Sequence, residues 1–139
     1  MTRRAFCWKV GLAVAALPVA GLGCAAAPVF RGALSGGRLA IPRASLVRDE
    51  EDLEVLVVRV ADATDPILLV RRGPGAFVAL SARCTHQGCH VRPSRGFLVC
   101  PCHGSTFGSD GEVVRGPAQA PLARYPVEVT DRGIEIVVQ

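Results

Sequence analysis

The pattern of apolar and polar positions along the chain predicts an all-β domain. Gly, Pro, Asp and Ser cluster between the apolar runs, as they do in tight turns. No segment shows a sustained helical period. The pattern therefore favours small antiparallel sheets, and the low aromatic content (5%) with 15 Gly and 10 Pro agrees with short strands joined by tight loops. We expect strands at 55–60, 67–70, 77–80, 97–99, 113–115, 125–129 and 134–138.

The first 24 residues resemble an export signal or a membrane anchor. Arg3 and Arg4 precede an apolar stretch, 10–29, that is near the minimum length for spanning a bilayer. Paired arginines followed by Phe6 resemble the twin-arginine signal, whose pathway carries proteins that are already folded. Cys24 stands where a lipoprotein would be acylated, so the sequence leaves three outcomes open: lipidation at Cys24, retention as an anchor, or simple cleavage. We expect the protein on the periplasmic side of the cytoplasmic membrane, tethered or released, with the N-terminus providing any membrane association.

The rest of the chain divides into two segments. Residues 25–37 are rich in Ala and Gly and lack periodicity, which predicts a flexible tether. The 139 residues of the chain are enough for one domain of ordinary size, at 38–139, behind an N-terminal appendage, and too few for two independent cores. We therefore expect a single folded domain behind a tether.

The charge of the chain argues against a nucleic-acid partner. The formal net charge is +4, but Arg3, Arg4 and Lys9 supply three of the 16 basic residues, and no acidic residue precedes Asp49. The remaining 13 basic residues face 12 acidic ones, so the exported part is nearly neutral. Neither a basic face nor interleaved aromatic residues, which nucleic-acid binding requires, is evident.

Two short boxes gather the chemically active side chains. Four of the six cysteines lie between positions 84 and 102, interleaved with the three histidines at 86, 90 and 103, which is the distribution of a metal site rather than of scattered disulfides. Each box offers at least one Cys and one His, and thirteen residues separate the first His from the next Cys. The boxes are Cys84-Thr85-His86-Gln87-Gly88-Cys89 and Cys100-Pro101-Cys102-His103-Gly104-Ser105.

Several interpretations of these boxes compete. Zinc also binds sets of two Cys and two His, but the additional Cys pair and the Gly and Ser positions favour an iron–sulfur site. Plain disulfides would not explain the histidines at fixed offsets. His90 follows Cys89, yet neither box needs it, and we expect it to be a surface residue.

Position by position, the boxes resemble the C-x-H-x-G-C and C-x-C-H-x-S motifs of the Rieske [2Fe–2S] proteins. This resemblance implies one [2Fe–2S] cluster, with Cys84 and Cys100 on one iron and His86 and His103 on the other. It also implies a disulfide between Cys89 and Cys102, as in the branch that includes the cytochrome bc-type complexes. The fold it implies is a set of small antiparallel sheets with a cluster-binding subdomain of two Cys/His loops.

The residues around the boxes have expected supporting roles. Gly88 and Gly104 allow the two loops to fold closely over the cluster, with backbone N–H groups directed at the sulfurs. Ser105 matches a family serine that bonds a bridging sulfide, whereas Phe107 replaces a family tyrosine that bonds a ligand Cys. Residues 116–118 resemble the proline-containing loop of the family, with Pro117 at its centre, although an ordinary turn after the strand at 113–115 is the alternative.

The sequence offers no nucleophile, phosphate loop or catalytic metal with an open position, so we expect an electron-transfer subunit rather than a stand-alone enzyme. The resemblance implies an iron–sulfur subunit of a quinol–cytochrome c-type oxidoreductase, with a cytochrome c-type acceptor and with cytochrome b and quinol as further partners. The alternative is a periplasmic carrier or a small Rieske subunit of an arsenite-oxidase-like molybdenum enzyme. Gln87 favours this alternative, because the quinol complexes usually have an apolar Leu there.

Overall fold

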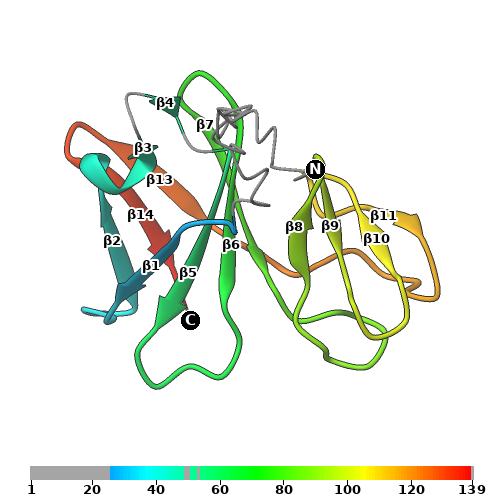
Figure 1. Cartoon of the computed structure of the whole chain (residues 1–139). Helices are drawn as coiled ribbons and strands as arrows, with labels where there is room; N and C mark the ends of the chain where they lie inside the picture. The colour runs from blue at the N-terminus through cyan, green and yellow to red at the C-terminus, as the bar shows by residue number, and fades with distance from the viewer. Residues whose placement is uncertain (1–25, 49–50, 53, 139) are drawn as a thin grey trace, which may run out of the picture.

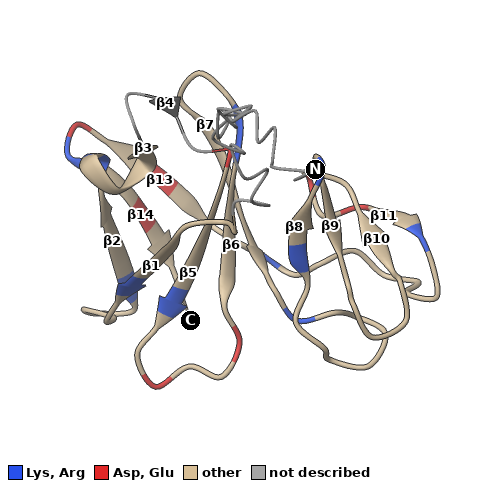
Figure 2. Ribbon diagram, viewed as in Figure 1, with Lys and Arg blue, Asp and Glu red and all other residues tan. Residues whose placement is uncertain are grey.

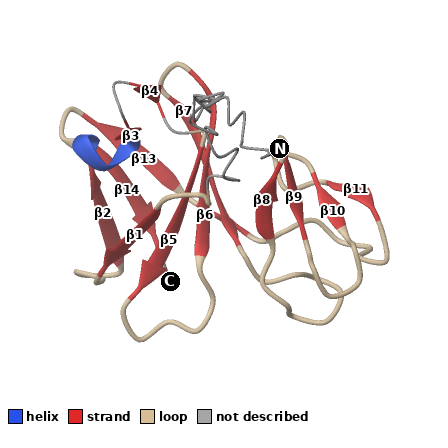
Figure 3. Cartoon of the chain, viewed as in Figure 1, coloured by secondary structure: helices blue, strands red, loops and turns tan. Residues whose placement is uncertain are grey.

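The computed structural model describes residues 26–48, 51–52 and 54–138, and they form two lobes of short strands joined by loops (Figures 1 and 3). The base lobe holds a five-stranded sheet of order β1-β5-β6-β7-β12, a three-stranded sheet of order β13-β14-β2, and the pair β3-β4. The small lobe holds one four-stranded sheet of order β11-β10-β9-β8. The strands are β1 (Val29–Gly32), β2 (Arg38–Pro42), β3 (Val47–Arg48), β4 (Glu51–Asp52), β5 (Val55–Val60), β6 (Ile67–Gly73), β7 (Ala76–Ser81), β8 (Arg92–Ser94), β9 (Phe97–Val99), β10 (Thr106–Phe107), β11 (Val113–Arg115), β12 (Arg124–Tyr125), β13 (Val127–Thr130) and β14 (Gly133–Val137).

Strand β6 lies between two hydrophobic cores and joins the lobes. Its residues 67–70 are all buried, and alternate side chains point to opposite faces of a strand. Ile67 and Leu69 enter the first core, which packs the five-stranded sheet against β2 and β14. Leu68 and Val70 enter the second core, which extends into the small lobe. Because the second core includes Cys84 and Cys100, the base lobe directly supports the two boxes.

The expected all-β fold of small sheets is confirmed, but the predicted tether differs from the expectation. Part of segment 25–37 forms β1, which pairs with β5 in parallel, whereas every other strand pair within the described residues is antiparallel. Phe30 packs against the first core, and the carbonyls of Pro28 and Gly32 accept hydrogen bonds from Val57 and Ala61. Because Ala and Gly residues surround this short apolar run, the sequence did not predict it as a strand. The folded domain therefore begins before residue 38.

Proline explains a second difference. The segment 125–129 was expected to be one strand, but the chain changes sheets at Pro126. Tyr125 pairs with β7, whereas Val127 pairs with β14. Proline has no N–H to donate to a ladder, so it separates the two pairings.

The only helix among the described residues is a 3-10 turn, η1 (Arg43–Leu46), between β2 and β3. Within that part of the chain, no helix is long and apolar enough to cross a membrane. The export signal or anchor predicted for residues 1–24, with Arg3, Arg4 and Cys24, lies outside the described residues.

Candidate metal centre

The two boxes lie in loops that share one backbone hydrogen-bond pattern. The first loop connects β7 to β8 and the second connects β9 to β10. In the first, the Cys84 N–H donates to the Cys89 carbonyl at 2.8 Å, and the Gly88 N–H donates to the Cys84 carbonyl at 2.9 Å. In the second, the Cys100 N–H donates to the Ser105 carbonyl at 2.8 Å, and the Gly104 N–H donates to the Cys100 carbonyl at 3.0 Å. Each loop is therefore a closed turn that begins at a cysteine.

The glycine at the fifth position of each turn has a left-handed backbone. Gly88 and Gly104 both have φ of 79°, where a side chain is strained. At Gly88 an added Cβ would also lie 3.3 Å from the Arg83 guanidinium, whereas at Gly104 no atom lies within 4 Å. The backbone conformation therefore favours glycine at both positions, and at Gly88 a side chain would also displace the Arg83 guanidinium.

The turns bring the predicted ligand side chains together in two pairs. Cys84 and Cys100 are free thiols, each 2% exposed, and they share a side-chain hydrogen bond. The rings of His86 and His103 lie 4.8 Å apart between centroids and are nearly perpendicular. His86 Nδ1 is buried and has no hydrogen-bond partner among the described residues. A buried imidazole nitrogen is rarely left unsatisfied, so the donor set fits a metal group between the loops.

Two opposing influences act on the Cys100 thiol. Burial raises its pKa above the ordinary value, because the thiolate loses contact with water, and the neighbouring Cys84 acts in the same direction. The backbone N–H groups of Cys102 and His103 donate towards Cys100 and favour the thiolate. The sequence predicted backbone N–H groups directed at the sulfurs near Gly88 and Gly104, but the N–H groups of these two glycines donate to the Cys84 and Cys100 carbonyls instead. The donors to Cys100 come from the two residues that follow Pro101.

Cys89 and Cys102 form a disulfide, as the resemblance implied. Their sulfurs are 1.99 Å apart and their Cα atoms 6.4 Å apart. The sulfurs of Cys89, Cys100 and Cys102 all lie within 4.8 Å of one another, so the disulfide packs directly against a candidate ligand. Because a disulfide sulfur is not a thiolate ligand, Cys84 and Cys100 are the two thiols left for a metal within the described part of the chain.

A third loop, between β11 and β12, is bonded to both boxes. The Ala118 N–H donates to Ser105 Oγ at 3.0 Å, and the Thr85 hydroxyl donates to the Ala120 carbonyl at 2.6 Å. Pro117, which precedes Ala118, is exposed. These contacts favour the proline-loop interpretation over an ordinary turn. Phe107 is fully buried in the second core with Cys84 and Cys100.

An ion pair and a hydrogen bond hold the start of the first loop. Sequence patterns did not reveal these contacts. Asp65 lies in the turn between β5 and β6, and its carboxylate is 3.4 Å from Arg83 Nη1 and 3.1 Å from His90 Nε2. His90, expected at the surface, is half-buried and paired. The sequence separations of 18 and 25 residues exclude any local signal for these contacts, although a charged residue directly before Cys84 was visible.

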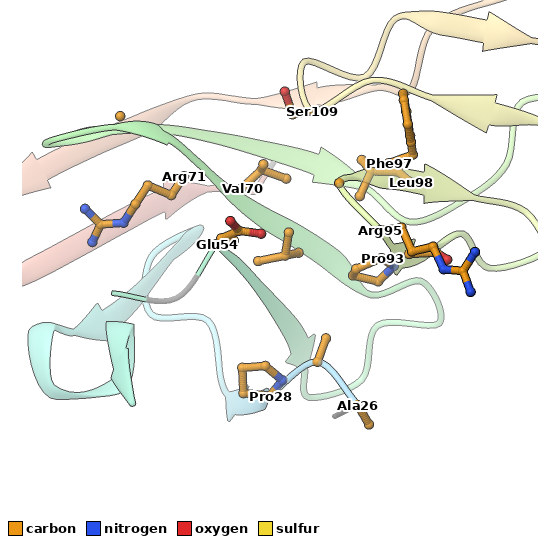
Figure 4. A pocket seen from close by; sticks show the side chains of 15 residues that line it. Ala26, Pro28, Glu54, Val70, Arg71, Pro93, Arg95, Phe97, Leu98 and Ser109 are labelled. Atoms are coloured by element: carbon orange, nitrogen blue, oxygen red, sulfur yellow. The ribbon is translucent and has the colours of Figure 1, made fainter. Parts of the chain in front are cut away.

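The structure has one pocket against the first box and another away from both boxes. One, of about 530 Å³, is lined by Ser81, Ala123 and residues 83–88, so it lies against the first loop. The other, of about 640 Å³, lies between the lobes and is lined by residues such as Val70, Pro93 and Leu98 (Figure 4). No Cys or His lines the second pocket, so it is separate from the candidate metal centre.

Comparison with known proteins identifies the family. The profile of the Rieske [2Fe-2S] domain matches residues 40–126, well over half of the chain. The chain belongs to the Rieske [2Fe–2S] family. As a Rieske protein it binds one [2Fe–2S] cluster and transfers single electrons through it.

Individual relatives agree with this assignment. The chain is 40% identical over 97 residues to the carotenoid phi-ring synthase of Chlorobaculum tepidum, covering 68% of this chain and 14% of the relative. It is 37% identical over 76 residues to the cytochrome b6-f complex iron-sulfur subunit of the same organism, covering 53% and 41%. The crystal structure of the cyanobacterial plasma membrane Rieske protein PetC3 from Synechocystis PCC 6803 aligns with a TM-score of 0.53 and 33% identity, covering 60% of this chain and 85% of that one. The chain thus spans less than half the length of the two curated relatives.

Proposed function

We propose that Cys84 and Cys100 hold one iron of the cluster and that His86 and His103 hold the other. The observation that carries this assignment is the buried, unpartnered Nδ1 of His86 next to the His103 ring. The two buried free thiols complete the donor set. When bound, the cluster accepts and releases one electron, and its two neutral imidazoles place the potential in a range of about −150 to +300 mV.

The two candidate cysteine ligands lie on a buried side of the centre, and the two candidate histidine ligands lie on an exposed side. Cys84 and Cys100 are buried, so water is excluded from the thiolates. His103 is exposed and His86 is half-buried, so the imidazoles form the side that a partner can approach. The disulfide ties the two loops together. The imidazoles therefore form an exposed route by which electrons can enter and leave.

We propose further that the protein is the iron–sulfur subunit of a quinol–cytochrome c-type oxidoreductase, working with cytochrome b, quinol and a cytochrome c-type acceptor. The support is the similarity to proteins named cytochrome b6-f complex iron-sulfur subunit, at 37% and 42% identity, together with the exposed His103. An exposed imidazole can receive a hydrogen bond from quinol, so that a proton and an electron leave together.

A second candidate is a periplasmic carrier, or a small Rieske subunit of an arsenite-oxidase-like molybdenum enzyme. Gln87 favours it, because this residue is exposed beside His86 and presents an amide where quinol docking calls for an apolar side chain. In this case the histidine side contacts another protein only.

Metal analysis and EPR test the ligand assignment. Purified holoprotein should contain two irons and two acid-labile sulfides, and reduction should give the signal of a mixed His/Cys cluster. His86→Ala and His103→Ala should each abolish that signal. His90→Ala is the matched control and should retain it, because His90 bonds Asp65 outside the boxes. Zinc alone in protein matured in a competent host would refute the assignment.

Co-purification separates the two candidate functions. A tagged full-length chain extracted from its native membranes in mild detergent should carry b-type and c-type haem in fixed ratio to iron–sulfur cluster. Recovery of the cluster protein without haem would contradict the complex and favour the carrier.

Export to the periplasmic side is part of the proposal. It is motivated by Arg3 and Arg4, and changing both to Lys should leave the protein in the cytoplasm with its cluster inserted. Unchanged export would show that the twin-arginine match is accidental. Palmitate labelling that disappears in Cys24→Ser would identify a lipid anchor.

A further inference from the structure

The strand register of the small lobe aligns four side chains in one row across its sheet. Arg92 pairs with Val99, Val99 pairs with Thr106, and Thr106 pairs with Arg115. Directly paired residues project from the same face of a sheet. Leu98 and Phe107, which neighbour Val99 and Thr106 in the chain, are buried in the second core. The row therefore lies on the opposite, outer face, which we call the arginine-flanked row.

The row lies beside the second box. Val99 directly precedes Cys100 and Thr106 directly follows Ser105, so the two central residues are the bases of the second loop. Both are half-buried, whereas Arg92 and Arg115 at the sheet edges are exposed. Adjacent strands are about 4.8 Å apart, so the two arginine backbones are separated by about 14 Å across the four strands.

The charges of the small lobe make this face positive. Residues 82–122 contain four arginines, at 83, 92, 95 and 115, and two acidic residues, Asp110 and Glu112. Both carboxylates are turned towards the base lobe: Arg72 of β6 lies 3.6 Å from Asp110, and Arg124 of β12 lies 3.2 Å from Glu112. Figure 2 shows basic residues on β8 and at the end of β11, and none on β9 or β10 between them.

Within the described part of the chain, no carboxylate compensates the two flanking arginines. Among the described residues, neither Arg92 nor Arg115 has an ion-pair partner, whereas Arg83 is paired with Asp65. A positive face next to the electron-transfer site attracts a negatively charged partner and accelerates its encounter.

We propose that the arginine-flanked row is the docking surface for an acidic redox-partner protein, whose carboxylates face Arg92 and Arg115 while its centre covers Val99 and Thr106. This inference rests on the proposed electron transfer to a protein partner and adds the location and charge of the contact. An acidic partner held there lies directly over the base of the Cys100 loop.

Stopped-flow oxidation of the reduced, full-length holoprotein tests the proposal with two c-type cytochromes of similar potential, one acidic and one basic. Raising the ionic strength from about 0.01 M to about 0.5 M shortens the Debye length from about 30 Å to a few ångströms. The rate with the acidic cytochrome should fall over this range, and the rate with the basic one should not. Arg92→Glu/Arg115→Glu should slow the acidic reaction about tenfold or more at low salt, which is the lower end of electrostatic steering. The milder Arg92→Gln/Arg115→Gln should show an intermediate loss.

The matched control is Arg31→Glu/Arg132→Glu, which changes the net charge equally on exposed positions of the base lobe. An unchanged EPR signal and midpoint potential will show that each variant retains its cluster. The proposal is overturned if the control slows the acidic reaction as much as the row variant, or if the wild-type rate is independent of salt. If reduced holoprotein passes electrons to neither cytochrome, the proposed electron transfer to a partner protein is refuted. The docking-surface proposal, which rests on it, is then refuted as well.

Discussion

Removing the Ser105 hydroxyl should lower the midpoint potential of the cluster. Ser105 lies in the second box and is completely buried. Its oxygen accepts a hydrogen bond from the Ala118 N–H at 3.0 Å, and no acceptor for its own proton is found among the described residues. A buried hydroxyl normally donates as well as accepts. We therefore expect its proton to bond a sulfur of the cluster.

The size of the effect follows from the charge that the bond stabilises. A hydrogen bond to a charged group contributes about 1.5–3 kcal/mol. If about half of this differs between the oxidised and the reduced state, the difference is about 1 kcal/mol, which corresponds to about 40 mV for one electron. Ser105→Ala should therefore lower the potential by about 40 mV or more. It should also destabilise the fold by about 1–3 kcal/mol, because the Ala118 N–H loses its acceptor.

Protein-film voltammetry and denaturant unfolding measure the two effects separately. Ser81→Ala is the matched control, because Ser81 is also buried and its oxygen accepts a backbone bond, from the Arg83 N–H at 3.1 Å, but it lies outside both boxes. The control should lose stability without a comparable drop in potential. An unchanged potential in Ser105→Ala, or an equal drop in both variants, would refute the reasoning.

Three further changes test other parts of the centre. Phe107→Tyr should raise the midpoint potential by tens of millivolts, because the added hydroxyl can bond a ligand sulfur from within the second core, and voltammetry showing a lower or unchanged value would contradict this. Replacing Cys89 and Cys102 together by Ser removes a cross-link across 13 residues, which is worth about 3 kcal/mol of loop-closure entropy. Chelators should therefore bleach the cluster faster in this variant than in the wild type. Equal bleaching rates would show that the disulfide does not stabilise the two ligand loops. Asp65→Asn should lower the unfolding free energy by less than about 1 kcal/mol, since the Arg83 side chain of this ion pair is largely exposed, and high salt should remove the difference in urea titrations. A loss of stability that survives high salt would show that Asp65 contributes through contacts other than this ion pair.

Local chemistry explains what could be predicted from the sequence. The strands at 55–60, 97–99 and 113–115 match β5, β9 and β11 because β-branched or apolar runs lie between clear turn residues. β8 and β10 were not predicted, since Pro93 disfavours a strand and β10 is only two residues long. These short strands are fixed by their neighbours in the sheet and not by their own sequence.

Long-range contacts explain what could not be predicted. The apolar run at 67–70 indicated a strand, but not that its two faces belong to different cores. Asp65 carries no local signal of its role, because its partners Arg83 and His90 reach it only after the chain has crossed β6 and β7. The boxes were visible because four cysteines and three histidines fall in one short stretch, whereas the base that orients them is distributed over the whole domain.

The two boxes share one backbone hydrogen-bond pattern but place their Cys and His residues at different positions in the turn. Each turn begins with a buried cysteine and closes on the carbonyl five residues later. In the first turn the third residue is His86 and the sixth is Cys89, whereas in the second the third is Cys102 and the fourth is His103. Because the two turns have the same hydrogen bonds, these offsets, together with the base that orients the loops, decide which side chains meet. The sixth position of one turn reaches the third of the other to form the disulfide, and the two imidazoles are left to face each other.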